Sequence, residues 1–123
     1  MSKMNYDHVL HANLMRVFNE RDAAARDAAI AHLFVAEPVM YEPDSVVEGR
    51  DAISAVAGHL LEQFGPSFRF APAGPAVENH GLAVLRWQAG PEGGPIAVTG
   101  TDAAHIVDGR IARLWVLLDP QAA

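Results

Sequence analysis

The 123-residue sequence contains no cysteine, which excludes disulfide bonds, thiolate nucleophiles and thiolate metal ligands. Basic residues are also scarce, with nine lysines and arginines against fifteen acidic residues and a net charge of -6. This balance argues against nucleic-acid binding and against docking on an anionic membrane, because both need basic side chains that neutralise phosphates. No stretch approaches the roughly 20 apolar residues of a membrane-spanning helix. The N-terminal segment lacks the apolar run of a signal peptide, so we expect a cytoplasmic protein.

Apolar residues are plentiful, at 50% of the chain. A chain of this length and composition can bury one hydrophobic core, and it shows no internal repeat and no linker. We therefore predict a single domain over residues 1–123.

The first half of the chain has the apolar spacing of helices. A helical stripe that ends near Asn19 is formed by Leu10, Leu14, Val17 and Phe18. Asp22 is the expected N-cap of a second, alanine-rich helix that Pro38 ends. A third helix is predicted from Gly49 to Gly65, where Gly65-Pro66 terminates it.

The second half of the chain alternates with the period of strands. Strands are predicted over residues 67–72, 82–88, 96–107 and 110–119, and over the short segment 39–42 in the first half. Asp108-Gly109 is a typical hairpin turn. Three helices followed by a meander predict an α+β fold, with the helices packed on one face of a strongly curved, mostly antiparallel sheet.

Strand alternation predicts which polar side chains face the interior of this sheet. Ala104 and Ile106 are core candidates, so Asp102 on the same side of the strand should point inward. Glu42 shares a face with Met40 in the short strand. Two carboxyl groups in an apolar interior would have raised pKa values, which suits proton transfer. The alternative is that each carboxyl group caps a loop or pairs with an arginine at the rim.

The same alternation predicts the apolar wall of a pocket between sheet and helices. Its predicted substrate-binding residues are Met40, Leu61, Leu85, Trp87, Leu114, Val116 and Leu118. Trp87 offers a flat apolar surface and an N–H donor, although an ordinary core tryptophan is an equal alternative. Trp115 should face outward, and with Leu117 nearby it suggests a subunit interface.

The histidines do not predict a metal site. His8 and His11 lie three residues apart on the first helix, but no carboxylate lies at a suitable spacing. The remaining histidines are scattered along the chain. We expect neither a metal ion nor a cofactor.

The order of several short motifs resembles the nuclear transport factor 2-like superfamily. These motifs are Tyr41-Glu42-Pro43, Glu48-Gly49-Arg50-Asp51-Ala52-Ile53, Gly100-Thr101-Asp102 and Asp108-Gly109-Arg110-Ile111. The nearest groups are the SnoaL-like polyketide cyclases and the ketosteroid isomerases. The resemblance covers almost the whole chain. It implies one SnoaL-like domain, a cone-shaped α+β barrel with a deep apolar pocket, and a homodimer formed through the outer sheet face.

The resemblance also implies roles for the two carboxyl groups. Glu42 stands where the isomerases place an aspartate base, and Asp102 where they place a neutral aspartic acid that donates to the enolate. The position of the isomerases' catalytic tyrosine holds Leu14, which joins the predicted apolar wall, and a supporting tyrosine is replaced by Ala57. Loss of one such donor costs about 10²–10³ in rate, so a true steroid isomerase is not expected.

A related activity is disfavoured for a similar reason. Val116 stands where limonene-epoxide hydrolases have their second aspartate. The SnoaL-type cyclases need chiefly one acid/base carboxyl group and an apolar pocket, and the sequence agrees with that pattern.

Together these features predict a protein that binds a small apolar molecule. It would be an isomerase or cyclase that uses carboxyl groups for acid/base proton transfer on an apolar carbonyl compound. The alternative is a non-catalytic ligand-binding or dimeric scaffold protein. Two carboxyl groups around one empty volume would favour chemistry. Ion pairs with Arg50, Arg86 or Arg110 would argue against it.

Overall fold

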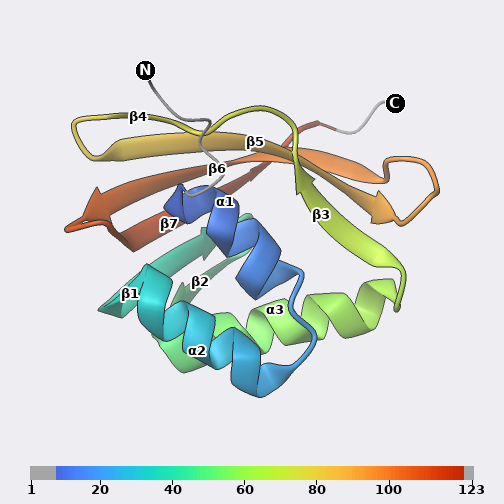
Figure 1. Ribbon diagram of the computed structural model, residues 1–123, viewed down its shortest axis with the longest axis horizontal. Helices are drawn as coiled ribbons and strands as arrows, with labels where there is room; N and C mark the ends of the chain where they lie inside the picture. Colours follow the sequence, from blue (N-terminus) through green and yellow to red (C-terminus); the bar gives the residue numbers. More distant parts are fainter. Residues whose placement is uncertain (1–7, 121–123) are drawn as a thin grey trace.

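The computed structural model describes residues 8–120, which form three helices and a curved, seven-stranded sheet. The sheet curves around the helices, which lie against its concave face (Figure 1). The helices are α1 (Val9–Asn13), continued by the π-helical turn η2 (Leu14–Phe18), then α2 (Ala23–Leu33) and α3 (Arg50–Phe64). The strands are β1 (Phe34–Glu42), β2 (Ser45–Glu48), β3 (Phe68–Pro72), β4 (Val77–Asn79), β5 (Leu82–Pro91), β6 (Val98–Val107) and β7 (Arg110–Leu118).

The strands are ordered β2-β1-β7-β6-β5-β3, and β4 pairs with β5. The β1–β7 pair is parallel and the other pairs are antiparallel, so the sheet is mixed. It remains unclosed. The predicted α+β architecture, with helices packed in a curved and mostly antiparallel sheet, is confirmed.

Two of the predicted helix boundaries follow from local chemistry. The Asp22 carboxylate accepts a hydrogen bond of 2.9 Å from the backbone N–H of Ala25 and caps α2. At the end of α3, Gly65 adopts a φ of +94°, a conformation that few other residues tolerate. The first helix differs from a regular helix, because the Asn19 N–H bonds to the Leu14 carbonyl five residues back.

The boundary between α2 and β1 lies earlier than predicted. Pro38 was expected to end the helix, but α2 ends at Leu33 and β1 begins at Phe34. Pro38 lies within β1, where the register with β7 shifts between Phe34 and Val39. A proline is tolerated there because its missing N–H removes no regular ladder bond. The short strands β2 and β4 were not predicted as strands.

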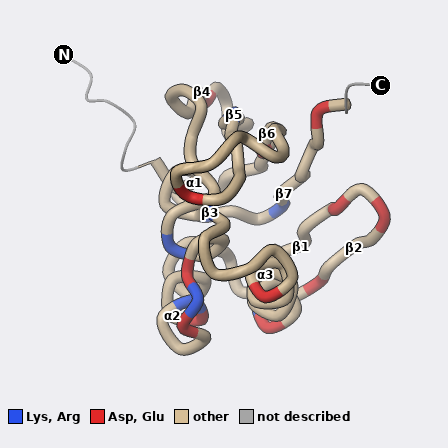
Figure 2. The backbone as a smooth tube through the Cα atoms, turned by 90° about the vertical axis from the view of Figure 1, so that its right-hand side faces the viewer, with Lys and Arg blue, Asp and Glu red and all other residues tan. Residues whose placement is uncertain are grey.

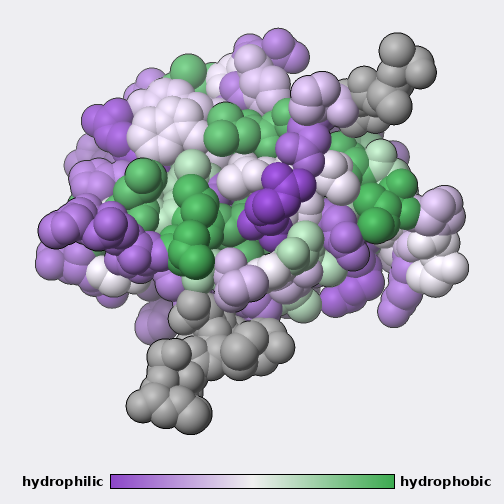
Figure 3. All heavy atoms as spheres, turned by 90° about the horizontal axis from the view of Figure 1, so that it is seen from above, coloured by the Kyte–Doolittle hydropathy of each residue, from purple (hydrophilic) through white to green (hydrophobic). Residues whose placement is uncertain are grey.

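The core fills the space between the helices and the concave face of the sheet. Side chains that are almost completely buried come from both layers, and include Leu10, Ile30, Phe34, Met40, Ile53, Leu85 and Leu114. The outer face is less uniform: seen from above, hydrophobic side chains lie among hydrophilic ones (Figure 3). No helix in residues 8–120 is long and apolar enough to span a membrane.

Candidate functional site

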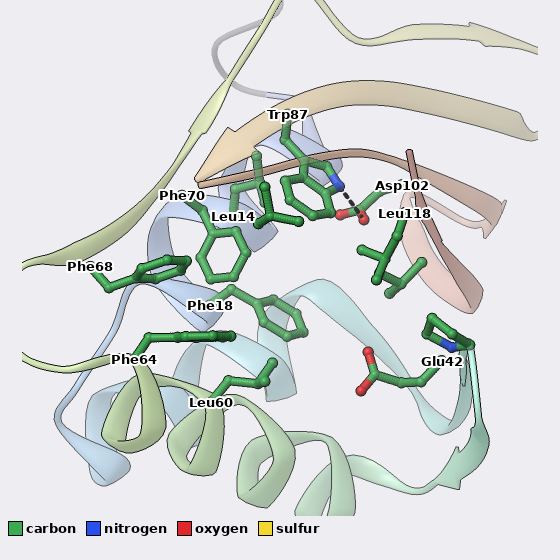
Figure 4. Close-up of a pocket in the computed structure, with 13 residues that line it drawn as sticks. Leu14, Phe18, Glu42, Leu60, Phe64, Phe68, Phe70, Trp87, Asp102 and Leu118 are labelled. Carbon is green, nitrogen blue, oxygen red and sulfur yellow. Dashed lines mark hydrogen bonds between the residues drawn. The ribbon is translucent and has the colours of Figure 1, made fainter. Parts of the chain in front are cut away.

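A cavity of about 180 Å³ lies between the sheet and the helices (Figure 4). Its wall is apolar or aromatic except for two carboxyl groups. The lining residues are Leu14, Phe18, Glu42, Pro43, Leu60, Phe64, Phe68, Phe70, Trp87, Val98, Asp102, Val116 and Leu118. Glu42 and Asp102, which are 60 positions apart in the sequence, thus border one apolar space.

The cavity has a closed floor and an open mouth. Asp102 and Trp87 are each only 3% exposed and form the floor, whereas Phe64 and Leu118 are 50% and 49% exposed and border the mouth. Glu42 is half-buried. The two carboxyl groups therefore differ in their access to water, and this difference separates their chemistry.

The floor is built from two neighbouring strands. Asp102 on β6 is paired with Leu85 on β5, and Trp87 is paired with Gly100. A Cβ atom at Gly100 would lie 2.5 Å from the Trp87 ring, so only glycine leaves room for the indole there. In this position the Trp87 Nε1–H donates a hydrogen bond of 2.9 Å to Asp102 Oδ1.

Burial raises the pKa of Asp102 from 3.8 to about 7. The Trp87 hydrogen bond opposes this change, because it favours the charged form, and the nearby charge of Glu42 adds to it. The pKa of Glu42 is also raised by burial. Near neutral pH, a substantial fraction of Asp102 is therefore the neutral acid.

The indole also favours one of the two oxygens of Asp102 as the site of the proton. An indole N–H is only a donor, so Oδ1 must act as the acceptor. In a neutral carboxyl group the carbonyl oxygen is the better acceptor, so this bond favours the proton on Oδ2, which has no hydrogen-bond partner among residues 8–120. Because Asp102 borders the cavity, this O–H can donate to a ligand there.

One wall of the cavity is a chain of aromatic rings from mouth to floor (Figure 4). Phe64 stacks on Phe68, with 4.4 Å between ring centroids, and Phe68 meets Phe70 edge-on. Phe70 in turn meets Phe18 and Trp87 edge-on. Phe68 and Phe70 were not predicted to bind a substrate, although the alternation in residues 67–72 places both on one face.

The structure separates the predicted apolar wall into two groups. Leu14, Trp87, Val116 and Leu118 line the cavity. The residues that are buried in the core and do not line it are Met40, Leu61, Leu85 and Leu114. Strand parity identifies the concave face, but helices cover parts of that face: α2 and α3 pack on β1, α1 packs on β5, and α2 reaches β7. Leu61 lies on α3 itself.

Arginine side chains near the sheet are engaged elsewhere. Arg86 pairs with Asp119 at 3.0 Å, and Arg50 donates to the carbonyl oxygens of Phe34 and Val35. In the described part of the chain, no arginine forms an ion pair with Glu42 or Asp102.

The histidines of the first helix do not meet at a metal-binding cluster. His8 Nδ1 accepts from the N–H of Leu10, and its Nε2 lies 2.8 Å from Glu78 Oε1. Across residues 8–120, no group of three or more potential metal-ligating side chains is present.

Comparison with known proteins agrees with this architecture. Residues 12–114 match the SnoaL-like domain family. A SnoaL-like family protein from Agrobacterium tumefaciens, provisionally named an isomerase, superimposes with a TM-score of 0.82. It shares 23% sequence identity over 91% of this chain and 95% of that chain. Among proteins with curated descriptions, none matches the sequence.

Two further crystal structures share the fold. A protein from Sinorhizobium meliloti, provisionally named a polyketide cyclase, has a TM-score of 0.68 and 20% identity over 88% of this chain and 92% of that chain. A provisionally named ketosteroid isomerase from Kribbella flavida has a TM-score of 0.69 and 14% identity over 94% of this chain and 78% of that chain. At these identities the likeness shows the fold alone.

Proposed function

The chain belongs to the SnoaL-like domain family, within the nuclear transport factor 2-like superfamily, and on this premise we propose that it is an acid/base enzyme. It moves a proton on a neutral, apolar carbonyl compound, as an isomerase or a cyclase does. The observation that carries the proposal is the placement of two carboxyl groups of unequal burial on one apolar cavity.

Asp102 acts as the acid in this mechanism. In its neutral form it donates from Oδ2 to the carbonyl oxygen of the substrate, while Trp87 holds Oδ1. Negative charge develops on that oxygen as an enolate forms. A donor already placed in a dry cavity stabilises this charge without reorganisation.

Glu42 acts as the base. Its ionised carboxylate takes a proton from the carbon next to the carbonyl group, and the C–H electron pair moves into the enolate. The protonated Glu42 then returns the proton to another carbon of the same system. The reaction shifts a double bond and consumes no second reactant, so it needs no cofactor.

The wall residues would have different roles in substrate binding. Leu14, Trp87, Val116 and Leu118 contact the substrate, because they border the cavity. Met40, Leu61, Leu85 and Leu114 act indirectly, because they pack behind this wall in the core.

The experiment is the conversion of cyclohex-3-enone to its conjugated isomer, followed by ultraviolet absorbance. We expect turnover by the wild-type protein and a loss of about 100-fold or more in both Glu42→Gln and Asp102→Asn. A matched control is Glu48→Gln, which removes a carboxylate of the neighbouring strand β2 that does not line the cavity. Equal rates in all four proteins would refute the mechanism. Ketone binding without isomerisation would instead favour a non-catalytic binding protein.

The outer face of the sheet supports a second proposal, that two copies of the chain associate there. Trp115 is 36% exposed and stacks on Tyr41, with 5.0 Å between ring centroids, and Leu117 is 51% exposed. Large apolar side chains that lie together at a surface are typical of subunit interfaces. Sedimentation analysis of the wild type and Trp115→Glu tests this, because the charge should shift a dimer to monomer. A monomeric wild type would contradict it.

A further inference from the structure

The cavity is small for a ligand site. An apolar cavity of about 150 Å³ accommodates benzene, which has six non-hydrogen atoms. Scaled by volume, the 180 Å³ of this cavity hold roughly seven non-hydrogen atoms. One six-membered ring with its carbonyl oxygen has that size. Sites for larger organic molecules typically measure about 300–1,000 Å³.

The walls leave little room for a wider ligand. On the aromatic side, Phe70 packs edge-on against Phe18, Phe68 and Trp87 at centroid distances of 5.5–6.0 Å. Behind the floor, the Trp87 ring lies directly against Gly100. A larger ligand whose carbonyl group reaches Asp102 can therefore extend only toward the mouth, where its outer atoms stay in water.

The charges around the cavity exclude anionic ligands. In the described part of the chain, no lysine, arginine or histidine lines the cavity. The β1–β2 hairpin, whose acidic residues are red in Figure 2, supplies Glu42 to the lining and carries Asp44 two residues further on. A phosphate or carboxylate group on the ligand would meet these like charges with no opposite charge to offset them.

The polar groups inside the cavity limit the ligand further. Apart from Glu42 and Asp102, the lining side chains carry only the Trp87 indole N–H, which is already bonded. Additional hydroxyl groups on a ligand would remain unpaired, and a buried unpaired polar group is unfavourable.

From these observations we propose that the substrate is a neutral cyclic ketone with one ring and one carbonyl group. In fused polycyclic ketones the additional rings add little to the binding affinity. The inference rests on the proposed function of the same cavity, and it selects a substrate class within that function.

The indole resonances of the two tryptophans provide a direct test. Trp87 lies on the cavity floor and Trp115 on the outer face. A ligand in the cavity should therefore shift the indole N–H signal of Trp87 and leave the signal of Trp115 unchanged. A Trp115→Phe variant assigns the signals. The ligands are cyclohexanone, 2-decalone and cyclohexanecarboxylate, titrated at pH 6 into ¹⁵N-labelled protein.

The second ring of decalone adds four carbon atoms, and their full burial would tighten binding more than about 100-fold. In the wild type we expect 2-decalone to bind less than tenfold more tightly than cyclohexanone. We expect cyclohexanecarboxylate to leave the Trp87 signal unshifted. Leu60→Ala removes part of a lining side chain and widens the cavity, so the affinity for decalone relative to cyclohexanone should rise above tenfold. Val56→Ala is the matched control, because Val56 is a half-buried residue of α3 that does not line the cavity.

The results separate this inference from the proposed function. A decalone gain of tenfold or more in the wild type would overturn the inference, even if cyclohex-3-enone is isomerised. Carboxylate binding as tight as that of cyclohexanone, or no Trp87 shift with either ketone, would overturn it as well. If cyclohexanone binds as expected but cyclohex-3-enone is not isomerised, the substrate class stands and the catalytic role fails.

Discussion

The substitution Asp102→Asn should stabilise the protein at alkaline pH while it removes activity. Asp102 has a pKa of about 7 in the folded chain, against 3.8 for the unperturbed group. Between these pH values the folded chain keeps a proton that the unfolded chain has released. The free energy of unfolding therefore falls as the pH rises through this range, and the loss is complete above about pH 7.

The structure sets the size of this effect. The difference between 3.8 and about 7 corresponds to about 4 kcal/mol of stability at pH 8. Asparagine has nearly the same shape and carries no charge, and its Oδ1 can still accept from Trp87. The stability of Asp102→Asn relative to wild type should thus rise by about 4 kcal/mol between pH 3.5 and pH 8. Any constant cost of the new amide group cancels in this pH-dependent difference.

Urea unfolding of both proteins at a series of pH values measures the effect. Asp119→Asn is the control, because hydrogen bonds from Thr99 and Arg86 lower the pKa of Asp119. The Asp119 carboxylate stabilises the folded chain above its unfolded pKa and loses this contribution as the pH falls. The stability of Asp119→Asn relative to wild type should therefore fall as the pH rises, whereas that of Asp102→Asn should rise. A constant difference between Asp102→Asn and wild type from pH 3.5 to pH 8 would refute the assignment of Asp102 as a buried neutral acid.

Four further predictions concern the Asp102–Trp87 pair and the buried core. The proposed isomerase activity should decline above about pH 7 as Asp102 loses its proton. Trp87→Phe removes a hydrogen bond that lowers the pKa of Asp102, so the alkaline limb of kcat/KM should move to higher pH; an unchanged or lower limb would contradict this. Gly100→Ala should displace the indole, because the new Cβ would lie 2.5 Å from its ring, and a shifted tryptophan emission spectrum would report it. Asn13 is fully buried, and neither polar atom of its side chain has a hydrogen-bond partner among residues 8–120, so Asn13→Leu should raise the free energy of unfolding by about 1 kcal/mol or more, measured by urea unfolding.

Much of the fold could be predicted because the signals are local. The Asp22 cap and the Gly65 stop depend on the chemistry of single residues at helix ends. The inward direction of Asp102 depends only on the two-residue period of a strand and on its apolar neighbour Ala104. The family resemblance rested on motif order, which the family match over residues 12–114 confirms.

Other local features were beyond sequence patterns. Pro38 is a strong helix breaker in isolation, but the helix had already ended at Leu33, and the register shift in β1 accommodates the proline. The π-helical turn over Leu14–Phe18 lies in a stripe that is periodic enough for an ordinary helix. In both cases tertiary packing overrides the local preference.

The sequence by itself determined which residues face inward, because side-chain direction in a strand follows from position alone. Only the tertiary structure decided which of them meet an empty space. Met40 and Leu118 both follow the predicted parity, but Met40 is covered by helices and Leu118 borders the mouth of the cavity. The pairing of β5 with β6 likewise brings Trp87 to Asp102. Burial depth and hydrogen-bond partners both depend on how distant segments pack. Burial raises the pKa of Asp102 to about 7, although the hydrogen bond from Trp87 opposes this change.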